Sequence, residues 1–456
     1  HKQHLVDGFS KEHDTHLLVY FEMHATMDSA IQREKQLKKW NIIFKAGLNE
    51  DTAATALWGS QQAELRGEGK YQGVFGLWYG KGPGVDRSGD VFRHANLAGT
   101  SPNGGVLVAM GDDHTGESST TLHQSDYALV DAMMPIFSPS GVQELLDYSA
   151  YGWALSRYAG VWVGLKCIKD TIEVTQVIDG KIDRVKPRFP SDGELVDASV
   201  RLHDLPVEQE KRLHLKKLPA VKEFIRNNNI NRVGLKSDKA TIGIISAGKS
   251  WLDTCHALSL LGIEKGEVQK LGLTTYKLGV VWPIEPEQLI EWASDLKIIV
   301  VVEEKRKLIE SQVKNILYNV ENKPAVIGEF DLAGQPMFDS HFALEPIVIS
   351  TKLGDIIYNE TKNRKISIRL KALLQERGQE SNSVVPPRTP YFCSGCPHNT
   401  STKIPDGSRA YAGIGCHYMA QWMDRETEGF THMGGEGANW IGEAPFSETE
   451  HVFQNI

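Results

Sequence analysis

Short apolar segments alternate with predicted helices over two long stretches of the chain. In the first stretch we predict strands and helices at residues 73–79, 85–98, 105–110, 134–137, 140–158 and 161–167. The second stretch begins at residue 241, with strands and helices at residues 241–246, 251–261, 274–278, 287–294, 297–302 and 308–317. Strands that alternate with helices build parallel sheets covered by helices. The sequence therefore predicts an α/β protein with parallel-sheet domains.

The composition is that of a globular protein and excludes several classes of function. The 456 residues suffice for two or three domains, and 41% are hydrophobic and 24% charged. A formal net charge of −8 gives no electrostatic support for nucleic-acid binding. Apolar runs such as 298–302 are far shorter than the roughly 20 residues that cross a membrane, and we find no secretory signal. Five cysteines, an odd number in a long chain, indicate a reducing compartment, so we expect a cytoplasmic protein.

Three of the five cysteines lie in one short window near the end of the chain. Cys393 and Cys396 form a C-x-x-C motif, and Cys416 follows in a glycine-rich turn. Such spacing lets thiolates share one metal centre, and soft thiolates suit zinc or iron–sulfur clusters. The residue types leave both open: a zinc site would take His398 or His417 as its fourth ligand, whereas the fourth ligand of a cluster is expected to be missing or to lie beyond this chain. A redox disulfide fits less well, because that motif normally opens a helix after a first strand.

Three motifs in the same region resemble a known family. They are CSGCPHN at 393–399, GIGCH at 413–417 and THMGGEG at 431–437. Together they resemble the thiamine-diphosphate domain of the 2-oxoacid:ferredoxin oxidoreductases, and most of all the long, fused indolepyruvate ferredoxin oxidoreductases. The resemblance runs from about Met27 to the last residue.

The resemblance implies transketolase-like domains, cofactors and a reaction. The cofactors would be thiamine diphosphate, Mg²⁺ and a 4Fe–4S cluster, and the cluster would be held by Cys393, Cys396 and Cys416. The thiamine-binding residues would be Glu50, Gly415, Met433, Gly434, Gly435 and Gly437. The reaction would be the oxidative decarboxylation of an aryl-pyruvate to an acyl-CoA, with coenzyme A as acyl acceptor and ferredoxin as electron acceptor. The resemblance also implies a homo-oligomer.

Glu50 has two readings. It lies at the start of a predicted helix, 52–62, which Asn49 or Asp51 could cap, after a short predicted strand at 41–45. On residue types alone a solvated carboxylate in a first helical turn is favoured. The resemblance instead implies the catalytic glutamate that thiamine enzymes hold against N1′ of the aminopyrimidine.

Two further patterns suggest other chemistry and are discounted. The string GIISAGKS at 243–250 satisfies G-x-x-x-x-G-K-S, and Glu303 and Glu304 follow an apolar strand as in a Walker B motif. A true P-loop has its first glycine at the end of a strand, whereas Gly243 falls inside the predicted one. Asp112, Asp113 and His114 suggest a metal, but such residues are common after strand ends. The alternative functions are therefore a P-loop NTPase with a zinc knot, or a non-catalytic remnant.

The resemblance also divides the chain into parts. They are an atypical pyrimidine-binding domain at 1–195, a linker at 196–240, a transketolase C-terminal-like domain at 241–345, a connection at 346–390 and the start of a diphosphate-binding domain at 391–456. We expect the linker to be solvated with one helix at 205–228, and the connection to hold one helix at 366–375. Cys167 and Cys255 are expected in the core.

The chain departs from the family in three places. It has no Gly-Asp-Gly turn for magnesium and no glycine-rich loop after a first strand at 17–21, and no cysteine follows Cys416. It also begins without methionine. We therefore expect a fragment of a longer enzyme that is inactive alone.

Overall fold

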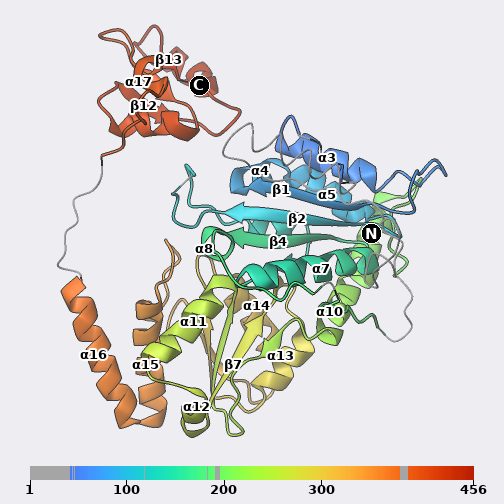
Figure 1. The fold of residues 1–456 in the computed structure, drawn as a ribbon, viewed down its shortest axis with the longest axis vertical. Coiled ribbons are helices and arrows are strands. Elements are labelled where there is room, and N and C mark those ends of the chain that lie inside the picture. Colours follow the sequence, from blue (N-terminus) through green and yellow to red (C-terminus); the bar gives the residue numbers. More distant parts are fainter. Residues whose placement is uncertain are drawn as a thin grey trace. The chain divides into compact units, whose positions relative to one another are not determined.

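The computed structural model describes residues 42–43, 45, 47–117, 119–181, 183–190, 196–380 and 389–455 (Figure 1). These residues form two compact units, the first from residues up to His114 and from 124 to 377, the second from 115–123 and from Gly378 onward. The predicted strand at 17–21 and the glycine-poor loop after it lie outside the described residues. None of the described helices is both long and apolar enough to span a membrane.

The first sheet of the first unit has the order β1-β2-β4-β3-β8. Its strands are β1 (Phe75–Lys81), β2 (Gly105–Asp112), β3 (Ile136–Phe137), β4 (Trp162–Ile168) and β8 (Val280–Trp282), of which only β8 runs antiparallel to its neighbour. The helices of this half are α3 (Glu50–Ser60), α4 (Gly82–Arg87), α5 (Gly89–Ala98), α6 (Asp126–Asp131), α7 (Val142–Ala159) and α8 (Lys169–Ile172). Figure 1 shows α3, α4 and α5 on one face of the sheet and α7 on the other.

The second sheet of the same unit has the order β10-β9-β6-β7-β5. Its strands are β5 (Arg232–Val233), β6 (Ile242–Ala247), β7 (Leu273–Leu278), β9 (Ile298–Val302) and β10 (Ala325–Ile327), all parallel except β5. Its helices are α11 (Gly248–Leu260), α12 (Lys265–Leu271), α13 (Pro286–Ala293), α14 (Leu308–Leu317), α15 (Pro346–Thr361) and α16 (Arg364–Glu380). The central strands β6 and β9 are buried along their whole length, as expected for parallel strands covered on both faces.

One strand joins the two sheets. β8 follows β7 in the chain, yet it pairs with β3 of the first sheet, Ile136 opposite Trp282. A single apolar cluster accordingly runs from Val106 and Trp162 in the first sheet to Ile299 and Val301 in the second. The two sheets therefore belong to one packed body.

The segment predicted as a solvated linker with one helix at 205–228 does contain that helix, but it is packed and not solvated. It forms a long helical run made of α9 (Pro206–Arg212), a π-helical turn (Leu213–Lys217) and α10 (Leu218–Asn227). Val221, Phe224 and Ile225 are fully buried in a cluster with residues of α7. The polar residues of this segment mark only the outer face of an amphipathic helix.

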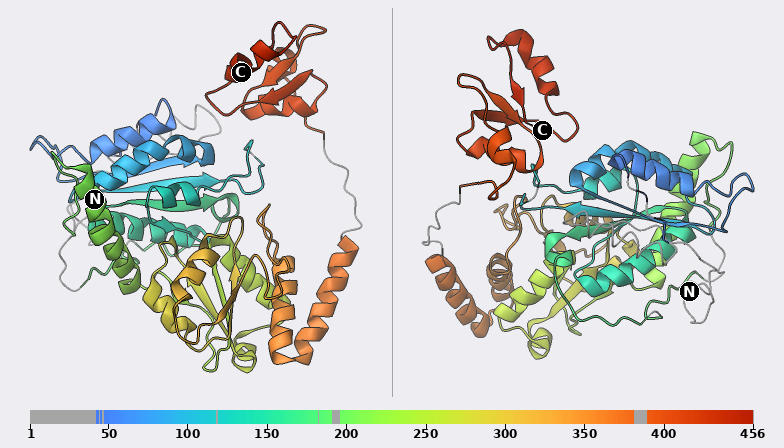
Figure 2. Two further views of the ribbon diagram at one scale, coloured as in Figure 1. Left: turned by 180° about the vertical axis from the view of Figure 1, so that it is seen from behind. Right: turned by 45° about the horizontal axis from the view of Figure 1, so that its top comes forward.

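The predicted connection at 346–390 also differs from the expectation, because it contains two helices. α15 was not predicted; it packs against α11, and its residues Ile349, Leu353 and Ile357 are fully buried. α16 lies beside α15 in the views of Figures 1 and 2. Because α15 completes the cover of the second sheet, it is part of the core.

Several smaller predictions were corrected. The described residues of the expected strand 41–45 are not in a strand. Cys255 is exposed, not in the core, whereas Cys167 is partly buried, and burial raises the pKa of its thiol to about 12.

The second compact unit has a parallel sheet with the order β12-β11-β13. Its strands are β11 (Ala410–Ala412), β12 (Thr427–Phe430) and β13 (Phe453–Gln454). Its helices are α17 (His398–Ser401), a 3₁₀-helix (Gly415–Trp422), α18 (Ala438–Glu443) and a short 3₁₀ turn (Ala444–Phe446).

Lys217 in the π-helical turn yields a prediction about stability and pH. Its side chain is fully buried, and Nζ donates to the carbonyl oxygens of Asn96 and Leu97 at 3.0 and 3.1 Å. Burial lowers the Lys217 pKa to about 7, against about 10.4 in an unfolded chain. Between these values the unfolded state binds more protons, so stability should rise with pH, by roughly 4 kcal/mol over the window.

Urea unfolding of wild type and Lys217→Met at several pH values between 7 and 10 would measure this effect. In Lys217→Met the free energy of unfolding should no longer rise with pH. In Lys216→Met, which removes the charge of an exposed neighbouring lysine, the rise should persist. Parallel curves for wild type and Lys217→Met would contradict the prediction.

Candidate functional site

Glu50 is the first residue of α3, and its neighbours fix its position. Asn49 caps the helix, and its Oδ1 accepts a hydrogen bond from the Thr52 N–H at 3.0 Å. The indole Nε1 of Trp78 in β1 donates to the Glu50 carbonyl oxygen at 3.0 Å. The half-buried Glu50 side chain lies against Gly84 of α4, where a Cβ would sit 2.6 Å from Glu50 Cγ.

These contacts explain the glycine in α4. Any side chain at Gly84 would push the Glu50 carboxylate away, because a Cβ there would also lie 3.2 Å from Oε1. Of the two helix-cap residues considered in the sequence, Asn49 is the one that caps. Glu50 thus lies at a helix start and is not on the open surface, while its catalytic role stays a prediction.

Cys393 and Cys396 lie on one tight turn of the second unit. The Cys396 N–H donates to the Cys393 carbonyl oxygen at 3.0 Å, and Gly395 between them has a φ of 76°, which suits glycine. Cys393 is exposed and Cys396 is partly buried. The turn therefore presents two thiols from a compact backbone loop, as the C-x-x-C spacing predicted.

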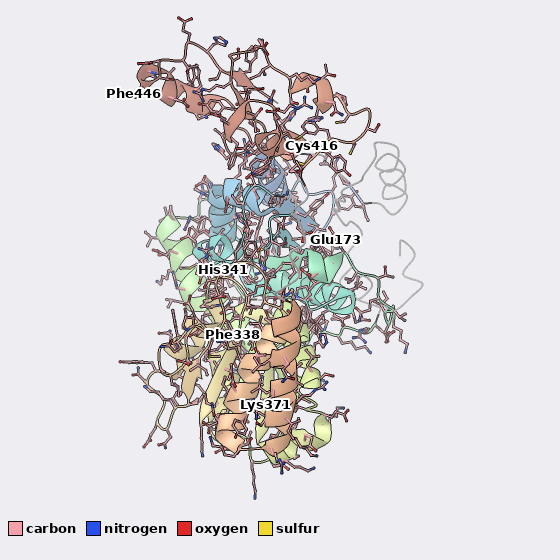
Figure 3. All side chains as sticks on the ribbon, turned by 90° about the vertical axis from the view of Figure 1, so that its left-hand side faces the viewer. Glu173, Phe338, His341, Lys371, Cys416 and Phe446 are labelled. Carbon is pink, nitrogen blue, oxygen red and sulfur yellow. The ribbon has the colours of Figure 1, made fainter. Side chains whose placement is uncertain are left out.

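A pair of histidines brings the Cys416 segment to this turn. Cys396 Sγ lies 3.0 Å from Nδ1 of His398, and the His398 ring centroid lies 4.2 Å from that of His417. His417 follows the exposed Cys416, labelled in Figure 3. Burial and the neighbouring His398 both lower the pKa of His417.

The described residues nevertheless contain no group of three or more His, Cys, Asp or Glu side chains arranged to hold a metal ion. Cys393, Cys396 and Cys416 therefore do not form a ready ligand set in this structure. The same holds for Asp112, Asp113 and His114. The cluster stays a prediction.

The predicted thiamine-binding glycines lie in backbone conformations that favour glycine. Gly415, Gly434 and Gly437 have φ angles of 80°, 85° and 79°. The Gly434 N–H donates to Glu436 Oε2 at 2.8 Å. A Cβ at Gly435 would meet the ring of His432, and Met433 is 41% exposed. Their role toward a cofactor stays a prediction.

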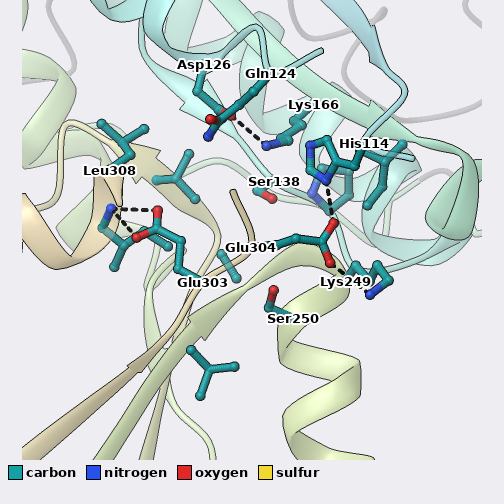
Figure 4. Close-up of a pocket in the computed structure, with 16 residues that line it drawn as sticks. His114, Gln124, Asp126, Ser138, Lys166, Lys249, Ser250, Glu303, Glu304 and Leu308 are labelled. Atoms are coloured by element: carbon teal, nitrogen blue, oxygen red, sulfur yellow. Dashed lines mark hydrogen bonds and ion pairs between the residues drawn. The ribbon is translucent and has the colours of Figure 1, made fainter. Parts of the chain in front are cut away.

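The first unit also holds a cavity of about 50 Å³ at the carboxyl ends of strands from both sheets (Figure 4). Glu304, directly after β9, accepts hydrogen bonds there from His114 Nδ1, from Lys249 Nζ at 3.0 Å and from the Leu344 N–H at 2.9 Å. Burial opposes ionisation of Glu304, but His114 and Lys249 together bring its pKa down to about 2. Glu304 is therefore ionised at neutral pH and links the two sheets.

The same contacts exclude the P-loop reading. Gly243, Ile244 and Ile245 lie inside β6 and leave no loop before α11. The lysine of the motif, Lys249, donates to Asp253 Oδ2 at 2.7 Å, to Glu304 and to the Leu344 carbonyl oxygen at 2.8 Å. All three of its protons are thus used within the protein.

Sequence reasoning noted the residues of this cavity but did not combine them. Both GDDH at 111–114 and GKS at 248–250 were examined as separate motifs. The signal that would have found the cavity is the placement of charged residues directly after several predicted parallel strands, since those ends share one edge of a sheet.

Comparisons with known proteins agree on one family. Residues 232–380 match the family model described as the indolepyruvate oxidoreductase domain. The chain is 24% identical over 382 residues to indolepyruvate oxidoreductase subunit IorA of Thermococcus kodakarensis, covering 80% of this chain and 52% of that protein. It is 23% identical over 371 residues to the IorA subunit of Methanothermobacter marburgensis, covering 80% of this chain and 53% of that protein. The chain thus spans about half the length of the curated relatives it matches.

A solved structure supports the fold. The 2-oxoglutarate:ferredoxin oxidoreductase from Magnetococcus marinus, with 2-oxoglutarate, coenzyme A and succinyl-CoA bound, superposes with a TM-score of 0.51 at 15% identity. The match covers 76% of this chain and 63% of that chain. The predicted α/β fold with transketolase-like parallel-sheet domains is confirmed.

Proposed function

We propose that the chain belongs to the indolepyruvate oxidoreductase family and forms part of a 2-oxoacid:ferredoxin oxidoreductase. The proposed reaction is the oxidative decarboxylation of an aryl-pyruvate, with coenzyme A as acyl acceptor and ferredoxin as electron acceptor. The proposed assembly is oligomeric, as the subunit names of the relatives suggest. The observation that carries the proposal within this chain is the placement of Glu50.

Glu50 suits the aminopyrimidine of thiamine diphosphate. Its backbone is held by Trp78, and its half-buried carboxylate lies over the bare Cα of Gly84. A proton-sharing group must come within hydrogen-bond reach of the atom it serves, and Gly84 leaves the space for the Glu50 side chain that a bulkier residue would fill. When bound, thiamine diphosphate would supply the carbanion chemistry that cleaves the bond to the carboxyl group of the substrate. Glu50 would hold a proton at N1′ of the aminopyrimidine.

The other proposed cofactors have weaker support. The described residues contain no set of oxygen ligands arranged for Mg²⁺, so no step is assigned to it. Cys393, Cys396 and Cys416 are the proposed ligands of a 4Fe–4S cluster because soft thiolates from neighbouring loops suit it. Their present arrangement is not a ligand set, so no electron path is drawn through them.

Replacing Cys416 with serine should remove most of the iron and acid-labile sulfide from anaerobically purified protein, because the cluster would lose one of its thiolates. Cys255→Ser is the matched control, since that exposed cysteine lies on α11 in the other compact unit. Iron content that is unchanged by serine at Cys393, Cys396 and Cys416 alike would rule out the cluster. Zinc in place of iron would support the zinc knot.

The substrate class is tested on the assembled enzyme. The complex would be isolated from cells through an affinity tag on this chain and assayed anaerobically for viologen reduction with thiamine diphosphate, Mg²⁺ and coenzyme A. Indolepyruvate should give dye reduction that depends on coenzyme A. Reduction with 2-oxoglutarate but not with aryl-pyruvates would overturn the proposed substrate class while keeping the reaction type.

A further inference from the structure

The cavity between the two sheets has polar groups with unused hydrogen-bonding capacity. It is lined by the ends of β2, β4, β6 and β9 and by the start of α11 (Figure 4). Its volume of about 50 Å³ exceeds what one water molecule requires. No part of the proposed oxidoreductase chemistry uses it.

The carboxylates around the cavity are already satisfied. Glu304 has its three donors, and Asp126 accepts from Lys166 Nζ at 2.6 Å. Glu303 accepts from the N–H groups of Ile309 at 2.7 Å and Glu310 at 3.2 Å, at the start of α14. Despite those bonds, burial raises the pKa of Glu303 to about 8, so this carboxyl carries little charge at neutral pH. The acidic groups therefore leave little demand for a cation.

The donors, in contrast, are not used up. His114 is only 8% exposed, its Nδ1 contacts Glu304, and its Nε2 is buried without a hydrogen-bond partner among the described residues. The closest charged atom recorded for Nε2 is Asp112 Oδ2, at 3.9 Å. Lys166 Nζ makes one recorded hydrogen bond, to Asp126, and a longer ion pair with Asp112 Oδ2 at 3.9 Å, although an ammonium carries three protons.

The start of α11 adds backbone donors. This 13-residue helix begins at Gly248 with no side chain from the described residues capping it, and the first N–H groups of a helix lack intrahelical partners. Lys249 and Ser250 of its first turn line the cavity. Gly248 has a φ of 50°, and a Cβ there would sit 2.5 Å from Ser138 Oγ. Glycine thus lets the uncapped helix start approach the cavity wall.

We propose that this cavity binds a small monoanion of the carboxylate class, such as formate or bicarbonate. His114 Nε2, Lys166 Nζ and the first N–H groups of α11 would donate to its oxygens. Helix N-termini favour negative charge. Glu304 would position the His114 ring through Nδ1. A dianion such as phosphate fits less well, because Asp126 and Glu304 line the same cavity.

Binding can be measured on the full chain without thiamine or substrate. Protein labelled with ¹⁵N-histidine would be titrated with formate, bicarbonate, acetate and phosphate against sodium chloride at equal ionic strength, and the ring nitrogen signals followed by NMR. The His114 signal, identified by its loss in His114→Gln, should shift and saturate with formate or bicarbonate. Whichever of these two saturates at the lower concentration identifies the physiological source as a carboxylate or as carbon dioxide.

The controls separate a specific site from general salt effects. His256→Gln alters an exposed histidine of the same helix α11, so the anion response of His114 should persist in it. Ser250→Val narrows the cavity and should raise the half-saturating concentration at least tenfold. If His114→Gln does not fold, Ser250→Val alone decides. No saturable shift, or the same shift with chloride, would overturn the proposal and leave a water-filled cavity.

Discussion

Glu50→Gln should lower turnover of the assembled enzyme by on the order of 10² to 10⁴-fold, the contribution expected of one general acid–base group. The glutamine keeps the size of the side chain and its contact with Gly84, but it cannot share a proton with N1′. Thiamine diphosphate should therefore still bind. The direct measurement is hydrogen–deuterium exchange at C2 of the bound thiazolium, which should become slow in the variant.

Glu68→Gln, at an exposed position of the same unit, is the matched control and should exchange at the wild-type rate. Fast C2 exchange in Glu50→Gln would assign the proton transfer to another residue. A variant that loses thiamine binding altogether would show that Glu50 serves the binding of the cofactor instead of its activation.

The second large effect is expected at Glu304. Replacing it with leucine leaves Lys249, His114 and the Leu344 N–H without their shared acceptor. Breaking a buried ion pair from one side typically costs about 3–5 kcal/mol. We expect the free energy of unfolding in urea at pH 7 to fall by about that amount.

Two variants sharpen this test. Glu345→Leu removes an exposed glutamate that makes no side-chain cap bond to α15 within the described chain, and it should change stability by less than about 0.5 kcal/mol. The loss of unfolding free energy in Glu304→Gln should lie between those of Glu304→Leu and Glu345→Leu, because the amide oxygen of glutamine still accepts hydrogen bonds. Since the Glu304 pKa is lowered to about 2, its contribution is present above the unfolded value of about 4.3 and is lost as pH falls toward 2. A Glu304→Leu protein as stable as wild type would show that the network is dispensable.

The strands that cross the core were the most predictable elements. β6 and β9 are largely apolar and are buried along their whole length, so their sequences show where they lie. The helix at 205–227 was predicted, but its burial was not, because its buried residues, Val221, Phe224 and Ile225, recur at helical spacing among many charges. The composition of a segment does not indicate that one face of a helix is buried, whereas the spacing of its apolar residues does.

The candidate sites also differ in how far local sequence patterns could predict them. The position of Glu50 at a helix start could be predicted from its cap, and Asn49 does cap α3; its catalytic role was implied only by the resemblance and stays a prediction. The cavity around His114 and Glu304 could not be found in this way, since 190 positions separate the two residues. Their meeting depends on how two sheets pack, which no local pattern encodes. For the cysteines, in contrast, the local pattern was clear. Their spacing predicts a shared metal centre, but in the described residues their side chains are not arranged to hold a metal ion.

The placement of β8 has a mechanical consequence. Because this strand is covalently part of the second half of the first unit but is hydrogen-bonded into the sheet of the first half, the two halves cannot swing apart like the lobes of a clamp without tearing a backbone ladder. Force applied to one half is transmitted to the other through peptide bonds and through the apolar cluster they share. The first unit should therefore move as one rigid body, with its two halves fixed to each other.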